Sequence, residues 1–234
     1  MKPQDSQIQR VVAVSVVIDV QVKRYRRRME RPTTGERLRR EGPPTPPRQS
    51  ASVILVRDDP GGPELLLVQR NPQQRFMGGF WVFPGGAVDD AESHRATAIR
   101  ELAEEAGVAG IDPEALVLYA RWITPELIKT RFDTRFFVVR APGGVLPRVD
   151  GDECVDLRWT TANAAIDAYA RDDIQLAFPT LKLVEGLAPF ETVDELLAHA
   201  RDLDVQPILP RVVLSGEERR ILLPGEPGYE VEGK

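Results

Sequence analysis

Residues Gly86–Val108 read GAVDDAESHRATAIRELAEEAGV, and this stretch determines how the rest of the chain is interpreted. Within it, Arg95–Ala106 has apolar residues at helical spacing and is followed by a glycine, which often ends a helix. Glu101, Glu104 and Glu105 are spaced i, i+3 and i+4, so a helix places all three carboxylates on one face. Three like charges on one face destabilise a helix unless a cation lies among them.

This carboxylate cluster favours a site for Mg²⁺ or Mn²⁺, because these hard cations prefer carboxylate, water and phosphate oxygens. A metal bound there neutralises a diphosphate and lowers the pKa of a bound water that attacks phosphorus. Arg100 precedes Glu104 by four residues and is placed to hold this carboxylate in one rotamer. Gly85 and Gly86 permit a sharp backbone turn, and we expect the Gly85 carbonyl to be a further metal ligand. The alternative is a solvated acidic helix face that binds no metal.

The remaining pattern predicts a mixed α/β chain. Apolar, β-branched runs separated by turn residues predict strands, and runs with helical spacing predict helices. The two kinds of element follow one another in a largely non-alternating order. Strands are expected at Ala51–Arg57, Glu64–Arg70, Phe80–Phe83, Leu116–Ile123, Arg131–Val139 and Cys154–Trp159, helices at Arg95–Ala106, Thr161–Arg171, Leu181–Leu187 and Thr192–Asp202, and a closing hairpin at Arg211–Leu214 with Arg220–Leu223.

The charge is unevenly distributed, and this locates a domain boundary. Residues 1–50 contain 12 basic and 5 acidic residues, a balance of +7, whereas residues 51–234 contain 19 basic and 31 acidic residues, a balance of −12. The proline-rich segment Pro43–Pro47 separates the two parts, and neither a helix nor a sheet accepts such a run. We therefore expect a basic N-terminal extension, 1–50, and a globular domain, 51–234. The extension is interpreted as a solvated, disordered tail; a nucleic-acid-binding arm and a true start at Met29 are the alternatives.

Composition excludes several classes of protein. The chain is 42% hydrophobic and 29% charged, which is ordinary for a globular protein and excludes collagen-like and wholly disordered chains. Its one cysteine, Cys154, has no partner for an internal disulfide, which argues for a reducing compartment. The longest apolar run, Val11–Ile18, is much shorter than the roughly 20 residues that cross a bilayer. We therefore expect a cytoplasmic protein without a membrane span.

The residues from Gly86 to Val108 follow the spacing G-x5-E-x7-R-E-U-x-E-E-x-G-U, where U is a bulky aliphatic residue. This pattern matches the Nudix box in full, and the chain resembles the Nudix hydrolases. The resemblance implies an α/β/α sandwich with a mixed β-sheet, here with extra C-terminal helices and a closing hairpin. It also implies hydrolysis of a nucleoside diphosphate linked to another group, with Glu104 and Glu105 as metal ligands and Glu101 as ligand or base.

A second pattern, upstream of the box, narrows the expected substrate. Leu66–Asn71 (LLVQRN), Arg75, Gly79 and Phe83–Gly86 (FPGG) keep every spacing of the signature L-L-T-x-R-S/A-x3-R-x3-G-x3-F-P-G-G. The chain is thereby similar to the coenzyme A pyrophosphatase branch of the family, with a valine for the threonine and an asparagine for the small residue. The guanidinium groups of Arg70 and Arg75 are suited to phosphates. The alternative is a pair of loop arginines beside an acidic domain.

Downstream, two segments also resemble the peroxisomal mammalian relatives of this branch and their bacterial counterparts, namely Arg121–Pro125 (RWITP) and Arg131–Phe137 (RFDTRFF). With the box, the resemblance covers about residues 51–230. Side chains alternate along a strand, so Asp133 and Arg135 share one face. These two residues either line a substrate cleft or take part in a cross-strand charge pair.

Several other residues receive a structural interpretation. The acidic loop 150–153 is interpreted as a solvated turn, with a distant metal ligand or base as the alternative. His94, just before the predicted helix, is expected to be exposed. Trp81 and Phe83 are expected in the core, with a base-stacking platform as the alternative.

We therefore predict a diphosphatase that uses Mg²⁺ or Mn²⁺ to cut coenzyme A or an acyl-coenzyme A into 3′,5′-ADP and 4′-phosphopantetheine or its acyl form. The alternatives are a Nudix hydrolase of ADP-ribose, dinucleotides or oxidised nucleotides, and a non-catalytic domain that senses a nucleotide. The expected partner is a small nucleotide-diphosphate substrate, with no membrane and no nucleic acid, and a homodimer is left open. The predicted catalytic residues are Glu101, Glu104, Glu105 and Arg100, the metal ligands Glu101, Glu104, Glu105 and Gly85, and the substrate-binding residues Arg70, Arg75, Asp133 and Arg135.

Overall fold

The computed structural model describes residue 38 and residues 42–215 and 218–230. Its strands are β1 (Arg48–Arg57), β2 (Glu64–Arg70), β3 (Trp81–Val82), β4 (Gly85–Ala87), β5 (Val117–Ile123), β6 (Phe132–Arg140), β7 (Cys154–Thr161), β8 (Pro207–Ile208), β9 (Arg211–Ser215) and β10 (Glu218–Leu222). Its helices are α3 (His94–Ala106), α4 (Ala162–Ala170), α5 (Phe178–Leu187) and α6 (Val193–Arg201), with a 3₁₀ turn, η2, at Pro113–Ala115.

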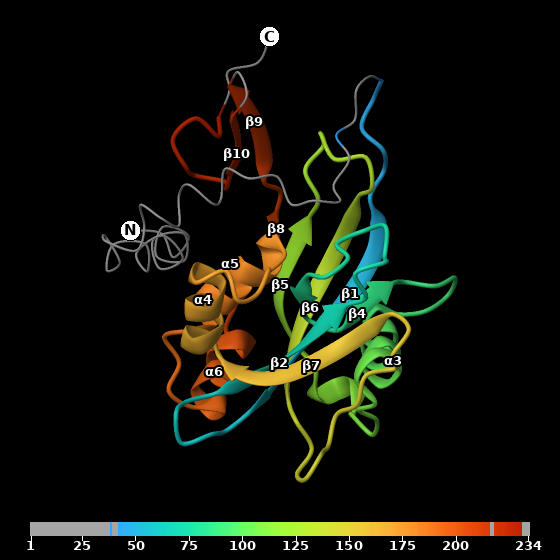
Figure 1. Ribbon diagram of the computed structural model, residues 1–234, viewed down its shortest axis with the longest axis vertical. Coiled ribbons are helices and arrows are strands. Elements are labelled where there is room, and N and C mark those ends of the chain that lie inside the picture. Colours follow the sequence, from blue (N-terminus) through green and yellow to red (C-terminus); the bar gives the residue numbers. More distant parts are fainter. Residues whose placement is uncertain (1–37, 39–41, 216–217, 231–234) are drawn as a thin grey trace.

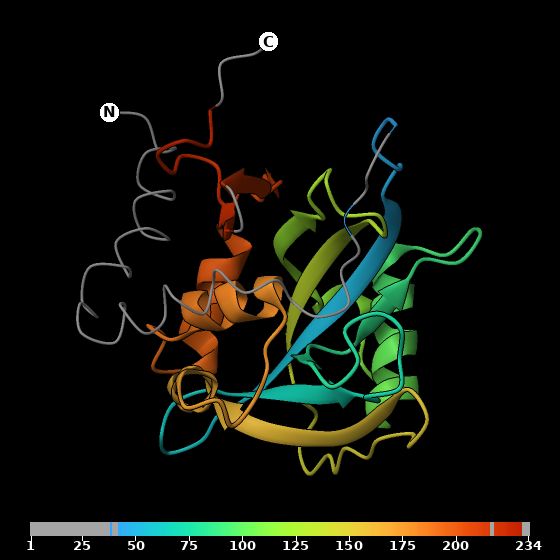
Figure 2. The same ribbon diagram turned by 45° about the horizontal axis from the view of Figure 1, so that its top comes forward.

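A mixed β-sheet lies at the centre, between helix α3 on one side and helices α4, α5 and α6 on the other (Figure 1). Figure 2 shows the same layers from a second direction, with α3 in green and the three C-terminal helices in orange on opposite sides of the strands. This arrangement confirms the expected α/β sandwich with a mixed sheet and extra C-terminal helices. The closing hairpin is confirmed as well, since β9 and β10 pair antiparallel.

The strand order β3-β2-β1-β6-β5-β8 places β1 inside the sheet, with β4 also pairing with β1 and β7 with β2. β1 runs parallel to β6 from Arg48 to Val56 and is buried from Ser50 to Val56. Parallel strands covered on both faces are apolar without alternation, which explains the continuous apolar run of β1. The expected pairing of β1 with β2 is confined to the two residue pairs next to their connecting turn. Beyond this turn β1 pairs with β4 and β2 pairs with β3.

Helix α3 is positioned by caps at both ends and by small residues on its inner face. The Ser93 side chain accepts a hydrogen bond from the Ala96 amide at the start of the helix, and Gly107 ends it with φ of 64°. A positive φ is readily adopted by glycine, so this residue ends the helix without strain. The inner face packs closely on β1, and its fully buried apolar residues are Ala98, Leu102 and Ala106.

The opposite face of the sheet forms a second core with α4, α5 and α6. Trp81 and Phe83 belong to this core and are each 3% exposed, which confirms their expected place in it. The two cores hold β1 from both sides and fix the position of β4, which begins two residues after Phe83.

Several boundaries differ from the sequence-based expectation, and the short strand β8 was not expected. Helix α5, for example, begins at Phe178, three residues before the expected Leu181. β1 begins at Arg48, three residues earlier than expected, because its first residues pair with β6. β4 was not predicted, since its glycines carry no strand signal. Most of the expected extension 1–50 lies outside the described residues. Within the described ranges, no helix is long and apolar enough to cross a membrane.

Candidate active site

Arg100 lies at the centre of the candidate site and binds several carboxylates at once. Its Nε and Nη2 donate to the two carboxylate oxygens of Glu92 at 3.2 and 3.0 Å. Its Nη1 donates to Glu101 at 2.8 Å and to Glu104 at 3.0 Å. Nη2 also donates to the Ala87 carbonyl at 3.2 Å. These contacts confirm the expected pairing with Glu104, and the guanidinium holds the pKa of Glu92 at about 2.

Glu105 has a different environment and is only 3% exposed. Its Oε2 accepts a hydrogen bond from the Gly85 amide at 2.9 Å, and its Oε1 lies 3.5 Å from Nη1 of Arg70. Burial raises the pKa of Glu105 to about 7, although the Gly85 amide and the Arg70 charge favour the ionised form. Cys154, at the start of β7, is buried next to this carboxyl, and burial raises the pKa of its thiol.

The two glycines of β4 are required by close packing. A β-carbon at Gly85 would lie 2.4 Å from the carbonyl oxygen of Ala51, and one at Gly86 would lie 2.2 Å from Oε1 of Glu101. Either substituent would displace a neighbour, because real β-carbons do not approach other atoms so closely. β4 therefore brings its backbone against the carboxylates of α3.

The three glutamates of α3 differ in exposure, with side chains that are 13% exposed for Glu101, 59% for Glu104 and 4% for Glu105. Burial raises the pKa of Glu101, and the neighbouring charges of Glu104 and Glu153 act in the same direction. In the part of the chain that the structure describes, no three acidic, histidine or cysteine side chains form an assembled metal-binding group. Arg100 occupies the space between Glu101 and Glu104, and Glu105 is bound to Gly85.

The donor set nevertheless fits a hard divalent cation. The carboxylates and the adjoining backbone of β4 offer oxygen ligands, which Mg²⁺ and Mn²⁺ prefer. Burial raises the pKa of both Glu101 and Glu105, so their ionised forms lack sufficient compensating positive charge. A bound cation supplies that charge and lowers the pKa of both groups.

The two arginines of the upstream signature have different surroundings in the structure. Arg70, at the end of β2, faces Glu105, and its buried Nε has no acceptor among the described residues. Arg75 is exposed in the loop after β2, and no ion pair joins it to any described carboxylate. The next residue, Phe76, packs against Phe132 at the start of β6, with ring centroids 5.7 Å apart. This loop is therefore attached to the sheet.

Asp133 takes part in a cross-strand charge pair, but its partner is Arg121 of β5. The Nε–Oδ1 and Nη2–Oδ2 distances are 2.8 and 2.6 Å. Arg135 instead contacts Nε2 of His94 and lies 3.4 Å from Oε1 of Gln49. The expectation that His94 is exposed was wrong, because the first turn of α3 lies over β1 and leaves this side chain half-buried.

Glu92 is a member of the site whose role the sequence left unassigned. It lies eight residues before Arg100 and supplies both of its carboxylate oxygens to that guanidinium. The eight-residue spacing between Glu92 and Arg100 in the motif was the sequence signal that could have identified this contact. In the loop 150–153, the Asp150 carboxylate accepts hydrogen bonds from the amides of Glu153 and Cys154, which confirms the expected turn.

Comparisons with known proteins agree with this site. The chain matches the NUDIX domain family over residues 46–179. It is 30% identical over 148 residues to putative 8-oxo-dGTP diphosphatase 3 of Mycobacterium tuberculosis, covering 62% of this chain and 67% of that protein. It is 33% identical over 122 residues to acyl-coenzyme A diphosphatase NUDT19 of Homo sapiens, covering 49% of this chain and 32% of that protein.

A solved structure has the same fold. The NUDIX hydrolase from Alicyclobacillus acidocaldarius matches with a TM-score of 0.59 and 24% identity, covering 66% of this chain and 96% of the other. Nudix hydrolases generally use divalent metal ions, in agreement with the oxygen donors gathered at α3. The chain belongs to the Nudix family and is a hydrolase that acts on pyrophosphate bonds.

Proposed function

We propose that this hydrolase cuts the diphosphate of coenzyme A or an acyl-coenzyme A, giving 3′,5′-ADP and 4′-phosphopantetheine or its acyl form. The observation that carries the proposal is the position of Arg70. This arginine of the coenzyme A signature lies against Glu105 of the Nudix box, and its Nε has no acceptor among the described residues. A phosphate group satisfies such a donor with a charge-assisted hydrogen bond.

The metal ligands that we propose are Glu101, Glu104, Glu105 and the carbonyl oxygen of Gly85. Mg²⁺ or Mn²⁺ at these oxygens supplies neutralising charge for the diphosphate and a bound water of lowered pKa. Glu104 is the most exposed of the three carboxylates, so it is the one most open to solvent and substrate. Glu101 serves as a further ligand or as the base.

The surrounding residues orient these groups. Arg100 holds Glu101 and Glu104, and Glu92 holds Arg100. The Gly85 amide fixes one oxygen of Glu105. Among the predicted substrate-binding residues, Arg70 and Arg75 are proposed as phosphate contacts. Asp133 and Arg135 remain proposed contacts at the other end of α3, next to His94.

Oxidised nucleotides are a second candidate substrate, and one observation favours them. The relative named for 8-oxo-dGTP matches 62% of this chain, whereas the acyl-coenzyme A diphosphatase matches 49%. Identity is similar in the two comparisons, so the longer match is the argument for this candidate. The signature that contains Arg70 and Arg75 is the argument against it.

Product analysis by mass spectrometry tests the proposal. Purified protein is incubated with Mg²⁺ or Mn²⁺ and, separately, with coenzyme A, an acyl-coenzyme A, ADP-ribose, NADH and 8-oxo-dGTP. Glu104→Gln is the inactive variant, and Glu191→Gln, an exposed change in the loop before α6, is the matched control. We expect 3′,5′-ADP from coenzyme A in the wild type and control only. If 8-oxo-dGTP is cleaved faster than coenzyme A, the proposal is wrong and oxidised nucleotides are the substrate class.

A further inference from the structure

Strand β7 forms one border of the central sheet. It pairs antiparallel with β2, and no other strand among the described residues pairs with it. Figure 2 shows β7 in yellow along the lower border of the sheet, outside β2. An unpaired strand edge presents a row of backbone donors and acceptors, and such a row is a template for pairing with another chain.

The amide of Leu157 shows which backbone groups face this open edge. It donates to the carboxylate of Asp156 at 2.8 Å, so it points away from β2. Backbone groups alternate between the two sides of an antiparallel strand, so those of Asp156 and Arg158 face β2. The ladder with β2 is regular from Asp156 to Thr161, and only Val155 is left without a partner in it. This regular stretch is suited to a further antiparallel strand.

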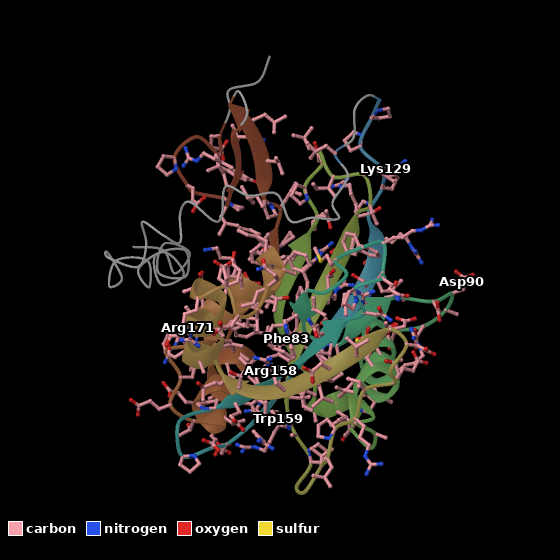
Figure 3. The ribbon with its side chains drawn as sticks, viewed as in Figure 1. Phe83, Asp90, Lys129, Arg158, Trp159 and Arg171 are labelled. Carbon is pink, nitrogen blue, oxygen red and sulfur yellow. The ribbon has the colours of Figure 1, made fainter. Side chains whose placement is uncertain are left out.

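The side chains along this edge are complementary to themselves. Asp156 and Arg158 are two residues apart and share one face of the sheet, whereas Leu157 lies on the other face. The Arg158 guanidinium stacks on Trp81, 4.0 Å from the ring centroid, and Figure 3 shows Arg158 and Trp159 on opposite sides of the strand. When a second copy of β7 runs antiparallel about Leu157, Asp156 of each copy lies opposite Arg158 of the other.

Neighbouring registers do not fit a pair of identical strands. A twofold axis at Asp156 or at Arg158 places like charges opposite each other, which destabilises a strand pair. It also brings together residues whose backbone groups face β2. With the axis at Leu157, this residue exchanges two backbone hydrogen bonds with its counterpart. The Asp156 carboxylate then gives up the Leu157 amide and binds the facing Arg158.

The same register covers an exposed apolar side chain. Val155 is 38% exposed, and in this pairing it lies opposite Trp159 of the second copy. Trp159 is itself partly buried at the edge of the core below α3. Free strand edges are commonly protected by lysine or proline, and β7 contains neither.

We propose that β7 is a homodimer interface, in which two copies of the chain pair antiparallel about Leu157 and join their sheets into one. The first residue of β7, Cys154, is buried next to Glu105. The interface therefore begins beside the candidate active site, and each copy contributes one such site. This inference does not depend on which substrate the protein cleaves.

The test measures the mass of the full chain by analytical ultracentrifugation over a series of concentrations. Asp156→Arg and Arg158→Asp each place like charges opposite each other at two positions of the interface. We expect a dimeric wild type, and a dimer dissociation constant that rises by about tenfold or more in either variant. Asp204→Arg and Arg201→Asp, exposed changes near the end of α6, are the matched controls and should dimerise as the wild type does. Thermal unfolding establishes that every variant is folded.

An equal mixture of the two interface variants separates a lost interface from a damaged fold. One copy then carries two arginines and the other two aspartates, so opposite charges face each other again at both positions. We expect the mixture of Asp156→Arg and Arg158→Asp to form heterodimers more tightly than either variant dimerises alone. A monomeric wild type overturns the inference. So does a dimer that neither variant weakens, or a mixture that dimerises no better than its components.

Cysteine substitutions test the register of the pair. The two α-carbons at Leu157 are expected about 5.5 Å apart, which a disulfide spans. Those at Val155 are offset by four residues along the strands, about 13 Å, which a disulfide does not span. Under mild oxidation we expect a disulfide-linked dimer of Leu157→Cys and none of Val155→Cys. A linked dimer of Val155→Cys, or none of Leu157→Cys, overturns the pairing about Leu157.

Discussion

Glu92 binds the guanidinium of Arg100 with both carboxylate oxygens, at 3.2 Å from Nε and 3.0 Å from Nη2. The remaining nitrogen, Nη1, is thereby directed at Glu101 and Glu104. A glutamate eight residues before the arginine thus fixes the carboxylates through that arginine. This relationship gives the spacing of the sequence motif a physical cause.

Replacing Glu92 with glutamine tests its positioning role. The amide loses the charge-assisted pair with Arg100, so Arg100 no longer holds Glu101 and Glu104 in one geometry. We expect kcat to fall roughly 10- to 100-fold with little change in KM. Steady-state kinetics measure this, with Asp90→Asn, at the exposed tip of the same loop, as the control (Figure 3). A kcat within twofold of the wild type would contradict the role.

Adding a methyl group at Gly86 tests the close approach of β4 to α3. A β-carbon there lies 2.2 Å from Oε1 of Glu101, so Gly86→Ala must displace that carboxylate. We expect more than about a tenfold loss of kcat, with the far-ultraviolet circular dichroism spectrum unchanged. Gly143→Ala, where the new β-carbon meets nothing within 4 Å, is the matched control. Full activity in Gly86→Ala would mean that Glu101 has no fixed position during turnover.

The Asp133–Arg121 pair predicts a pH dependence of stability. The Arg121 side chain lowers the pKa of Asp133 below its usual value of 3.8. The pair therefore stabilises the fold fully above pH 3.8, and this contribution is lost as the pH falls through the lower pKa of the folded state. We expect Asp133→Asn to lower the free energy of unfolding by about 1–3 kcal/mol at pH 7.

Urea unfolding at pH 7 and at pH 3 measures this effect, with the exposed change Asp204→Asn as the control. The difference between the wild type and Asp133→Asn should shrink at the lower pH. A difference that stays constant across this range would show that the carboxylate charge does not stabilise the fold.

Cys154 is predicted to be chemically inert in the folded protein. It is fully buried, and burial raises the pKa of its thiol, so little reactive thiolate is present at neutral pH. We expect a disulfide reagent such as DTNB to label it rapidly in denaturant and at least about a hundredfold more slowly in buffer. Rapid labelling of the native protein would show that β7 opens next to Glu105.

Periodicity and turn residues were sufficient to predict most of the fold. Helix α3 was predicted to within one residue, because its apolar spacing and the glycine after it are local signals. β4 was missed because Gly85 and Gly86 form a strand only through pairing with β1, a long-range contact. The confinement of β1–β2 pairing has a similar cause, since β4 and β3 take the places beside β1 and β2 that a longer hairpin would fill.

The sequence predicted which residues form the candidate site, but only part of their arrangement in space. Helical spacing placed the three glutamates on one face, but it carried no information about the burial of Glu105. Its contacts come from β2 and β4, whose approach depends on the folded sheet.

The central claim is that the glutamates of α3 hold a divalent metal that is required to hydrolyse the diphosphate. The most direct test is the initial rate of 3′,5′-ADP release from coenzyme A as a function of Mg²⁺ concentration. We expect no release in EDTA, restoration by added Mg²⁺ in the wild type and in Glu191→Gln, and no restoration at any concentration in Glu104→Gln. Release that continues in EDTA, or a Glu104→Gln variant with the wild-type response to Mg²⁺, would contradict the account.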